Sequence, residues 1–167
     1  IISLLSPTVR IIIEWYHDNL KRKEAERSLA DYADQLRFMA EAVPQKIFTA
    51  RPDGYIDYFN PQWMEFTGLS FDQIKGWGWL QFVHPDDLEE NKLRWQEAVD
   101  EGAPFNFEQR FRSGEGEYRW HLSRARAMKD ENGIVVRWFG SNTDMHDLKL
   151  KEQQKDEFIS IASHEMK

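Results

Sequence analysis

The chain has 167 residues, a formal net charge of −7 and no cysteine. This length suits one ordinary domain with flanking helices. The acidic balance, with no basic cluster beyond Lys21-Arg22-Lys23, argues against a nucleic-acid-binding protein. The absence of cysteine excludes disulfides, thiolate metal sites and thiol nucleophiles, and it is compatible with a cytoplasmic location.

Glycine and proline divide the chain into three parts. All nine glycines fall between Gly54 and Gly140, whereas residues 8–43 and 141–167 contain neither glycine nor proline. Because these two residue types interrupt helices, we expect a helix, a loop-rich core and a second helix. We place the N-terminal helix at 1–36, the core domain at 37–147 and the C-terminal helical segment at 148–167.

The first residues, Ile1 to Ile13, are apolar but are interrupted by Pro7 and Arg10. A membrane span needs about 20 apolar residues, so this stretch is too short to be a complete one. Two interpretations stay open: a linker helix, which we favour, or the end of an upstream membrane segment that anchors a longer parent protein. The absence of an initial Met favours an excised fragment. Ser6-Pro7 has the residue types of a helix start.

A second pattern in this segment is a heptad. Its apolar members are spaced three, four, three and four residues apart: Leu29, Tyr32, Leu36, Met39 and Val43. This spacing is typical of a coiled coil with a second helix. It fits equally well an amphipathic helix that packs on its own domain. Pro44 should end the helix.

The core domain begins with a predicted hairpin and two short helices. Strands at Lys46–Arg51 and Tyr55–Phe59 flank Pro52-Asp53-Gly54, whose residue types suit a tight turn. Pro61–Phe66 should form the first short helix. Ser70 and Gln73 have the spacing of a capping box for the second.

The second half of the core is predicted to contain a long helix and three strands. Asp86 can cap a helix that runs to Glu101 and stops at Gly102. Alternating apolar residues and turn signals then predict strands at Phe105–Phe111, Tyr118–Met128 and Ile134–Asn142. The order of elements predicts an α+β fold: a five-stranded antiparallel sheet with helices on one face, flanked by long terminal helices of coiled-coil type.

The large apolar side chains of this core could line a pocket between sheet and helices. We select five candidates from the predicted inward faces: Phe66, Trp95, Phe107, Trp120 and Val136. The alternative is that these residues simply fill the core. Because Trp120 is placed inward, its neighbour His121 is expected to face solvent.

Several short motifs in the core resemble those of PAS domains. They are His84-Pro85-Asp86-Asp87, Tyr118-Arg119-Trp120 and Gly140-Ser141-Asn142-Thr143-Asp144, the last in the position of the family's C-terminal (PAC) motif. The resemblance spans residues 36–147. It implies a sensory domain with an unidentified ligand, in which Asp144 couples the core to the output helix. His146 stands where the family has a threonine.

The end of the chain carries a histidine on a predicted helix. Lys155, Ile159, Ala162 and Met166 share one helical face, and His164 lies about 140–200° around the helix from them. An imidazole in this position is reachable and can act as a nucleophile, with Glu165 beside it as an orienting group or proton acceptor. The alternative is a solvated His-Glu pair.

Residues 158–167, Phe-Ile-Ser-Ile-Ala-Ser-His-Glu-Met-Lys, resemble the start of the dimerisation and phosphoacceptor helix of sensor histidine kinases. The resemblance implies that His164 accepts the γ-phosphate of ATP and that Glu165 is its acid/base neighbour. It also implies a parallel homodimer through the terminal helices, a response regulator as partner, and ATP and Mg²⁺ bound by a kinase nucleotide-binding domain. This fragment lacks that domain, so we expect it to be inactive alone. A non-enzymatic PAS module that binds ligand, dimerises and regulates another output domain is the alternative.

Cofactor chemistry within the fragment itself is not expected. A photoactive flavin adduct needs a cysteine, and the predicted helix 86–101 has no histidine to ligate haem. We expect no metal site, and we interpret His17, His84 and His121 as structural or surface residues.

Overall fold

The computed structural model describes residues 6–166. The chain divides into two compact units between Ala42 and Val43, a few residues after the expected border at residue 36. We describe each unit by itself.

The first unit is one helix, α1 (Pro7–Ala42). Ser6 begins it: its Oγ accepts a hydrogen bond from the Val9 amide at 3.4 Å. The helix ends two residues before Pro44, as predicted. No side chain of α1 is buried. The four heptad residues within it, Leu29, Tyr32, Leu36 and Met39, are exposed, whereas Val43 follows the helix and is half-buried. No helix within residues 6–166 has the length and apolarity needed to cross a membrane; Ile1–Leu5 of the apolar N-terminal stretch lie outside the described residues.

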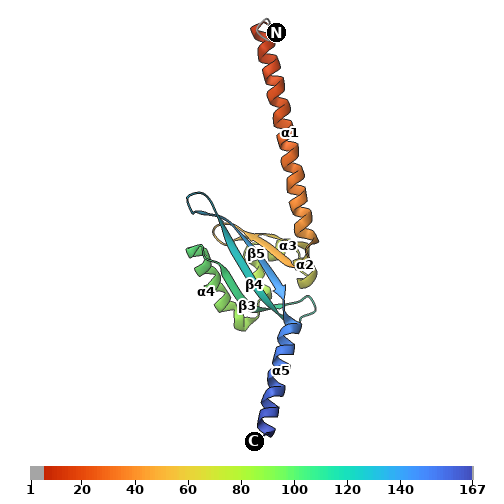
Figure 1. Ribbon diagram of the computed structural model, residues 1–167, viewed down its shortest axis with the longest axis vertical. Coiled ribbons are helices and arrows are strands. Elements are labelled where there is room, and N and C mark those ends of the chain that lie inside the picture. Colours follow the sequence, from red (N-terminus) through yellow and green to blue (C-terminus); the bar gives the residue numbers. More distant parts are fainter. Residues whose placement is uncertain (1–5, 167) are drawn as a thin grey trace. The chain divides into compact units, whose positions relative to one another are not determined.

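The second unit is built on a five-stranded antiparallel sheet, which confirms the predicted fold class (Figure 1). Its order is β2-β1-β5-β4-β3, with every neighbouring pair antiparallel. The strands are β1 (Lys46–Ala50), β2 (Ile56–Phe59), β3 (Phe105–Arg112), β4 (Tyr118–Lys129) and β5 (Val135–Asp144). Since β5 lies in the centre of the sheet, the helix that follows it, α5 (His146–Glu165), leaves from the middle of the domain.

Four short or medium helices cover one face of this sheet. They are α2 (Pro61–Thr67), α3 (Phe71–Ile74), the 3₁₀-helix η2 (Gly78–Phe82) and α4 (Pro85–Glu101). The predicted capping box of Ser70 and Gln73 is present at the start of α3. The predicted cap of α4 is wrong: His84, not Asp86, is the capping residue. The His84 Nδ1 atom accepts a hydrogen bond from the Asp86 amide at 3.0 Å.

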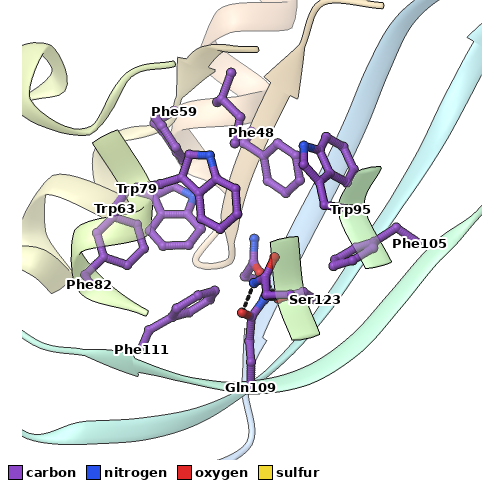
Figure 2. Close-up of a pocket in the computed structure, with 13 residues that line it drawn as sticks. Phe48, Phe59, Trp63, Trp79, Phe82, Trp95, Phe105, Gln109, Phe111 and Ser123 are labelled. Carbon is purple, nitrogen blue, oxygen red and sulfur yellow. Dashed lines mark hydrogen bonds between the residues drawn. The ribbon is translucent and has the colours of Figure 1, made fainter. Parts of the chain in front are cut away.

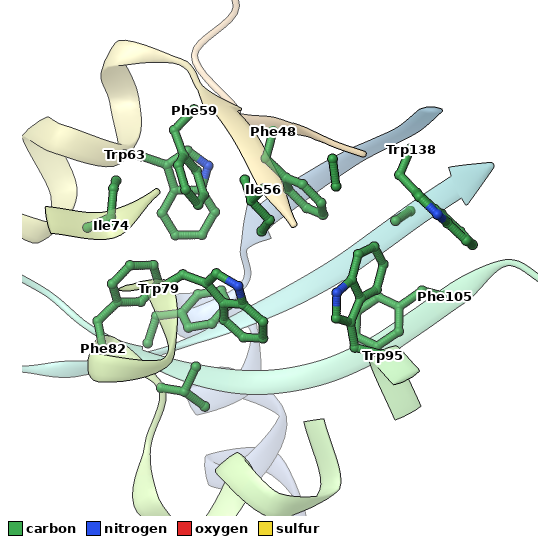
Figure 3. Packing of buried hydrophobic residues seen from close by; sticks show 14 of the residues in the cluster. Phe48, Ile56, Phe59, Trp63, Ile74, Trp79, Phe82, Trp95, Phe105 and Trp138 are labelled. Carbon is green, nitrogen blue, oxygen red and sulfur yellow. The ribbon is translucent and has the colours of Figure 1, made fainter. Parts of the chain in front are cut away.

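Aromatic side chains fill the space between sheet and helices (Figure 3). Trp63 from α2 packs against Phe82 of η2 and Phe111 of β3, with ring centroids 5.2 and 5.4 Å apart. At the other end of the core, Trp95 of α4 contacts Trp138 of β5 at 5.2 Å. Each buried ring removes a large apolar area from water, so these contacts fix which face of the sheet the helices cover.

Two predicted side-chain directions in the late strands are wrong. On β4 the buried residues are His121, Ser123 and Ala125, so Trp120 lies on the opposite, outer face. Val136 is exposed because of a β-bulge: Met128 pairs with Arg137 and Lys129 with Val135, which leaves Val136 unpaired.

A substitution at Gly140 tests how tightly β5 packs against the Phe48 side chain of β1. A Cβ atom at this position would lie 2.1 Å from the ring of Phe48, its cross-strand partner. We expect Gly140→Ala to lower the free energy of unfolding by about 1–3 kcal/mol, because the core is overpacked. Urea denaturation measures this. Ser141→Ala, the next residue on the outer face, is the control; equal stability of both variants would contradict the packing described.

Candidate functional site

A small cavity lies in the aromatic core, between the sheet and the helices (Figure 2). Its volume is about 30 Å³, enough for about two water molecules or a ligand of a few non-hydrogen atoms. The aromatic part of its wall comes from β1, β2, β3 and all the covering helices except α3, and includes Phe48, Phe59, Trp63, Trp79, Phe82, Trp95, Phe105 and Phe111.

The polar part of the cavity wall is a row of four hydrogen-bonded side chains. Asn91 of α4 donates to Gln109 of β3, Gln109 Nε2 donates to Ser123 Oγ of β4 at 2.7 Å, and Ser123 donates to Asn142 of β5. All four are buried, so the row satisfies polar groups that would otherwise destabilise the core. The row therefore connects helix α4 to the central strand β5 through the floor of the cavity.

The cavity wall favours a neutral occupant. None of the described residues that line it is ionisable, and a charged ligand buried without a countercharge would be strongly destabilised. The indole N–H groups of Trp63 and Trp79, both lining residues, are buried without a hydrogen-bond partner among the described residues. A ligand with hydrogen-bond acceptors could use these donors.

Of the five predicted pocket residues, the structure brings only Trp95 to this cavity. Phe66 is half-buried on α2, and its ring centroid lies 5.0 Å from that of His121. Phe107 lies under the guanidinium of Arg94. Trp120 lies on the outer face of the sheet, away from the cavity, and Val136 lies in the β-bulge of β5. Sequence reasoning missed the polar row, although Gln109, which alternates with Phe105, Phe107 and Phe111, was a signal for it.

Asp144 makes hydrogen bonds on both sides of the junction between the sheet and α5. Asp144 Oδ2 accepts a hydrogen bond from Arg119 Nε at 2.8 Å, and its Oδ1 accepts one from the His146 amide at 3.0 Å. Burial alone would raise the pKa of Asp144, but these hydrogen bonds outweigh it and hold the pKa below its usual value. The carboxylate thus joins β4 to the first residue of α5.

His146 adds a second connection at this junction. Its Nδ1 accepts a hydrogen bond from the Trp120 amide of β4 at 3.3 Å. This side chain therefore provides an acceptor at the position where the PAS motif has a threonine hydroxyl. The sequence identified the position but not the contact.

His121 is a buried histidine beside this junction, not the solvent-facing residue expected. Its Nδ1 lies 2.9 Å from the Arg119 carbonyl oxygen and so carries the proton, whereas Nε2 has no hydrogen-bond partner among the described residues. Burial, assisted by the nearby Lys46 ammonium, lowers the pKa of His121 to about 4. Burial also lowers the pKa of Lys46, whose Nζ lies 4.1 Å from the Phe66 ring centroid.

His164 and Glu165 lie in the last turn of α5, and both are exposed. The segment predicted to carry the phosphoacceptor histidine is therefore helical and presents that imidazole to solvent in the single chain. Among residues 6–166, no three His, Asp or Glu side chains gather in a way that could hold a metal ion.

His121 should make stability depend on pH. Since its folded pKa of about 4 is below the value of 6.5 for a free histidine, the unfolded chain binds more protons between these values. Stability is full above pH 6.5 and falls as pH drops toward 4, by about 3 kcal/mol at most. Asp87 and Asp144, with pKa values lowered from 3.8, lose their contribution only at lower pH.

Urea denaturation between pH 4.5 and 7.5 measures this dependence. We expect His121→Gln to flatten the curve, whereas His17→Gln, on exposed α1, should leave it unchanged. Parallel curves for the wild type and His121→Gln would show that the buried imidazole is not responsible.

The sequence is similar to a known family and to several known proteins. The family described as PAS fold matches residues 56–142. A protein y4lL of Sinorhizobium fredii is 33% identical over 162 residues, covering 94% of this chain and 19% of that protein. The peroxide stress-activated histidine kinase mak1 of Schizosaccharomyces pombe is 31% identical over 178 residues, covering 90% and 11%. The two-component sensor PprA of Pseudomonas aeruginosa is 27% identical over 139 residues, covering 80% and 14%.

A solved structure shares the fold. The PAS domain of a Colwellia psychrerythraea protein superposes with a TM-score of 0.58 at 22% identity, covering 70% of this chain and 98% of that one. The chain spans less than a fifth of the length of each of the three relatives. The matched residues 56–142 include the cavity wall on β3, β4 and β5, and on this evidence the chain belongs to the PAS-fold family.

Proposed function

We propose that this chain is the sensory and phosphoacceptor part of a two-component sensor histidine kinase. The observation that carries the proposal is α5, a helix tied to the PAS core at Asp144 and presenting His164 near its exposed end. Sequence similarity to two proteins, one named as a histidine kinase and one as a two-component sensor, supports it. So does the resemblance of residues 158–167 to the phosphoacceptor helix of such kinases.

His164 would be the nucleophile of the phosphorylation step. One imidazole nitrogen attacks the γ-phosphorus of ATP, an N–P bond forms, and the bond to the oxygen of the leaving ADP breaks. Glu165 orients the ring and accepts the proton lost from it. ATP and Mg²⁺ would be bound by a separate nucleotide-binding domain, and phosphohistidine would then pass its phosphoryl group to an aspartate of a response regulator.

The signal would enter through the core. An occupant of the cavity contacts the polar row, and Asn142 of that row lies two residues before Asp144 on β5. A shift of β5 would therefore change the Arg119–Asp144 contact and with it the direction of α5. Such coupling needs two states whose stability differs by a few kcal/mol. Since its nucleotide substrate is cytoplasmic, we place the module in the cytoplasm.

His164 is tested by phosphorylation in trans. The chain is mixed with a histidine kinase nucleotide-binding domain, ATP and Mg²⁺, and acid-labile phosphate is quantified. We expect labelling of the wild type, complete loss in His164→Ala, and slower labelling in Glu165→Gln because the proton acceptor is missing. His17→Ala, an exposed histidine of α1 that leaves the phosphoacceptor and the α5 junction intact, is the control. Equal labelling of wild type and His164→Ala would overturn the assignment and favour a non-enzymatic PAS module.

Dimerisation through the terminal helices is part of the same proposal. The heptad residues Leu29, Tyr32, Leu36 and Met39 are 61–73% exposed in the single chain, and pairing of two α1 helices would cover them. We expect a dimer in sedimentation equilibrium, with weaker association in Leu36→Asp. Phe38→Asp, which is 72% exposed but off the heptad, is the matched control. A monomer at micromolar concentration, or equal effects of both variants, would contradict the pairing.

A further inference from the structure

Trp120 lies on the outer face of the sheet, where two cationic side chains contact its ring. The guanidinium carbon of Arg110 on β3 is 4.9 Å from the ring centroid, and Lys149 Nζ on α5 is 5.3 Å from it. Both distances are within the range of cation–π attraction. One indole thus contacts both an edge strand of the sheet and the output helix.

Arg110 is itself bound to helix α4. Asp87, in the first turn of α4, accepts hydrogen bonds from Arg110 Nε at 3.0 Å, from its second guanidinium nitrogen at 2.7 Å and from its backbone amide at 2.8 Å. Such bidentate pairing fixes the plane of the guanidinium as well as its position. Burial alone would raise the pKa of Asp87, but these hydrogen bonds hold it below its usual value. The position of Arg110 therefore follows the start of α4.

Lys149 is bound to the sheet by an ion pair. Its Nζ forms an ion pair with Glu108 of β3. Asp87 and Glu108 thus provide one negative charge for each of the two cations at Trp120, so that Arg110 and Lys149 can share one indole without net repulsion.

We propose that Trp120 is a positioning residue in a relay from α4 to α5, formed by Asp87, Arg110, Trp120 and Lys149. This relay is separate from the contacts of Asp144. Its value for signalling rests on the proposed function, but its existence does not.

The relay is connected to the cavity wall through helix α4. Asn91, which ends the polar row of the cavity, is four residues after Asp87 and so lies one turn further along α4. A cavity occupant that displaces Asn91 would therefore also move Asp87. Arg110 would follow, and the ring of Trp120 would hold or release Lys149 in the first turn of α5.

Hydrogen–deuterium exchange of the α5 amides in this 167-residue chain tests the relay without any kinase reaction. We expect Trp120→Leu to speed exchange in residues 147–153 by about two- to fivefold, because the contact of the indole with Lys149 of α5 is lost. Trp120→Tyr, which keeps an aromatic ring, should restore most of the protection. Lys149→Met, which also removes the ion pair with Glu108, should speed exchange at least as much as Trp120→Leu. Lys151→Met, which changes an exposed lysine on the same helix, should have no effect.

The decisive variant is remote from α5. Asp87→Ala should also speed exchange of residues 147–153, by about twofold or more, and should add nothing when combined with Trp120→Leu. Glu90→Gln, on the exposed side of α4 and paired with Arg94, is the control. Unchanged exchange of the β4 and β5 amides verifies that the variants remain folded; if these amides also exchange faster, the same comparison is made with Arg110→Lys, which keeps the charge.

Three outcomes would overturn the relay. They are unchanged α5 exchange in Trp120→Leu, unchanged exchange in Asp87→Ala, or additive effects of the two substitutions. Phosphorylation of His164 in trans, measured on the same variants, separates this proposal from the previous one. Coupled exchange without phosphorylation would keep the relay and reject the kinase function, whereas phosphorylation with no change in exchange would do the reverse.

Discussion

The contact between Arg119 and Asp144 is the constraint on which the attachment of α5 to the sheet depends. The two residues lie on neighbouring central strands, next to the point where β5 ends and α5 begins. Asp144 also accepts the first amide of α5, so one carboxylate holds both the sheet and the helix. A neutral or missing carboxylate would leave the start of α5 without this connection, and the helix could then change direction relative to the sheet.

The free energy of this contact is small enough for the contact to form and break reversibly. The Arg119 and Asp144 side chains are 25% and 33% exposed, and ion pairs of this kind contribute on the order of 1 kcal/mol. The hydrogen bond of His146 and the contacts of Lys149 add similar amounts. Since 1.4 kcal/mol changes an equilibrium tenfold, a small ligand in the cavity could shift the balance between two directions of α5 by changing one or two of these contacts.

The elements of the fold were predictable from the sequence, but several side-chain directions were not. Turn residues and apolar alternation are local signals, and they located the strands, the α-helices and the antiparallel sheet, but not the 3₁₀-helix η2. Trp120 and His121 were assigned to the wrong faces because hydrophobicity predicts that an aromatic ring is buried in preference to an imidazole. Here tertiary contacts decide otherwise: His121 packs between Phe66 and Phe111, while Trp120 is covered by Arg110 and Lys149. Val136 was misplaced by a bulge, which depends on strand register and leaves no local signal. The exposed position of His164 on a helix followed from local periodicity. Its role as phosphoacceptor rests on the family resemblance and stays a prediction.

We propose that the state of the Arg119–Asp144 contact sets the position of His164. Because the chain has no cysteine, a single Ser160→Cys substitution on α5 allows one spin label per chain. In the proposed dimer, pulsed electron paramagnetic resonance then gives the distance between the two labels. The account predicts that Arg119→Gln shifts or broadens this distance distribution while circular dichroism of the folded core stays unchanged. Superimposable distributions with and without Arg119 would contradict it.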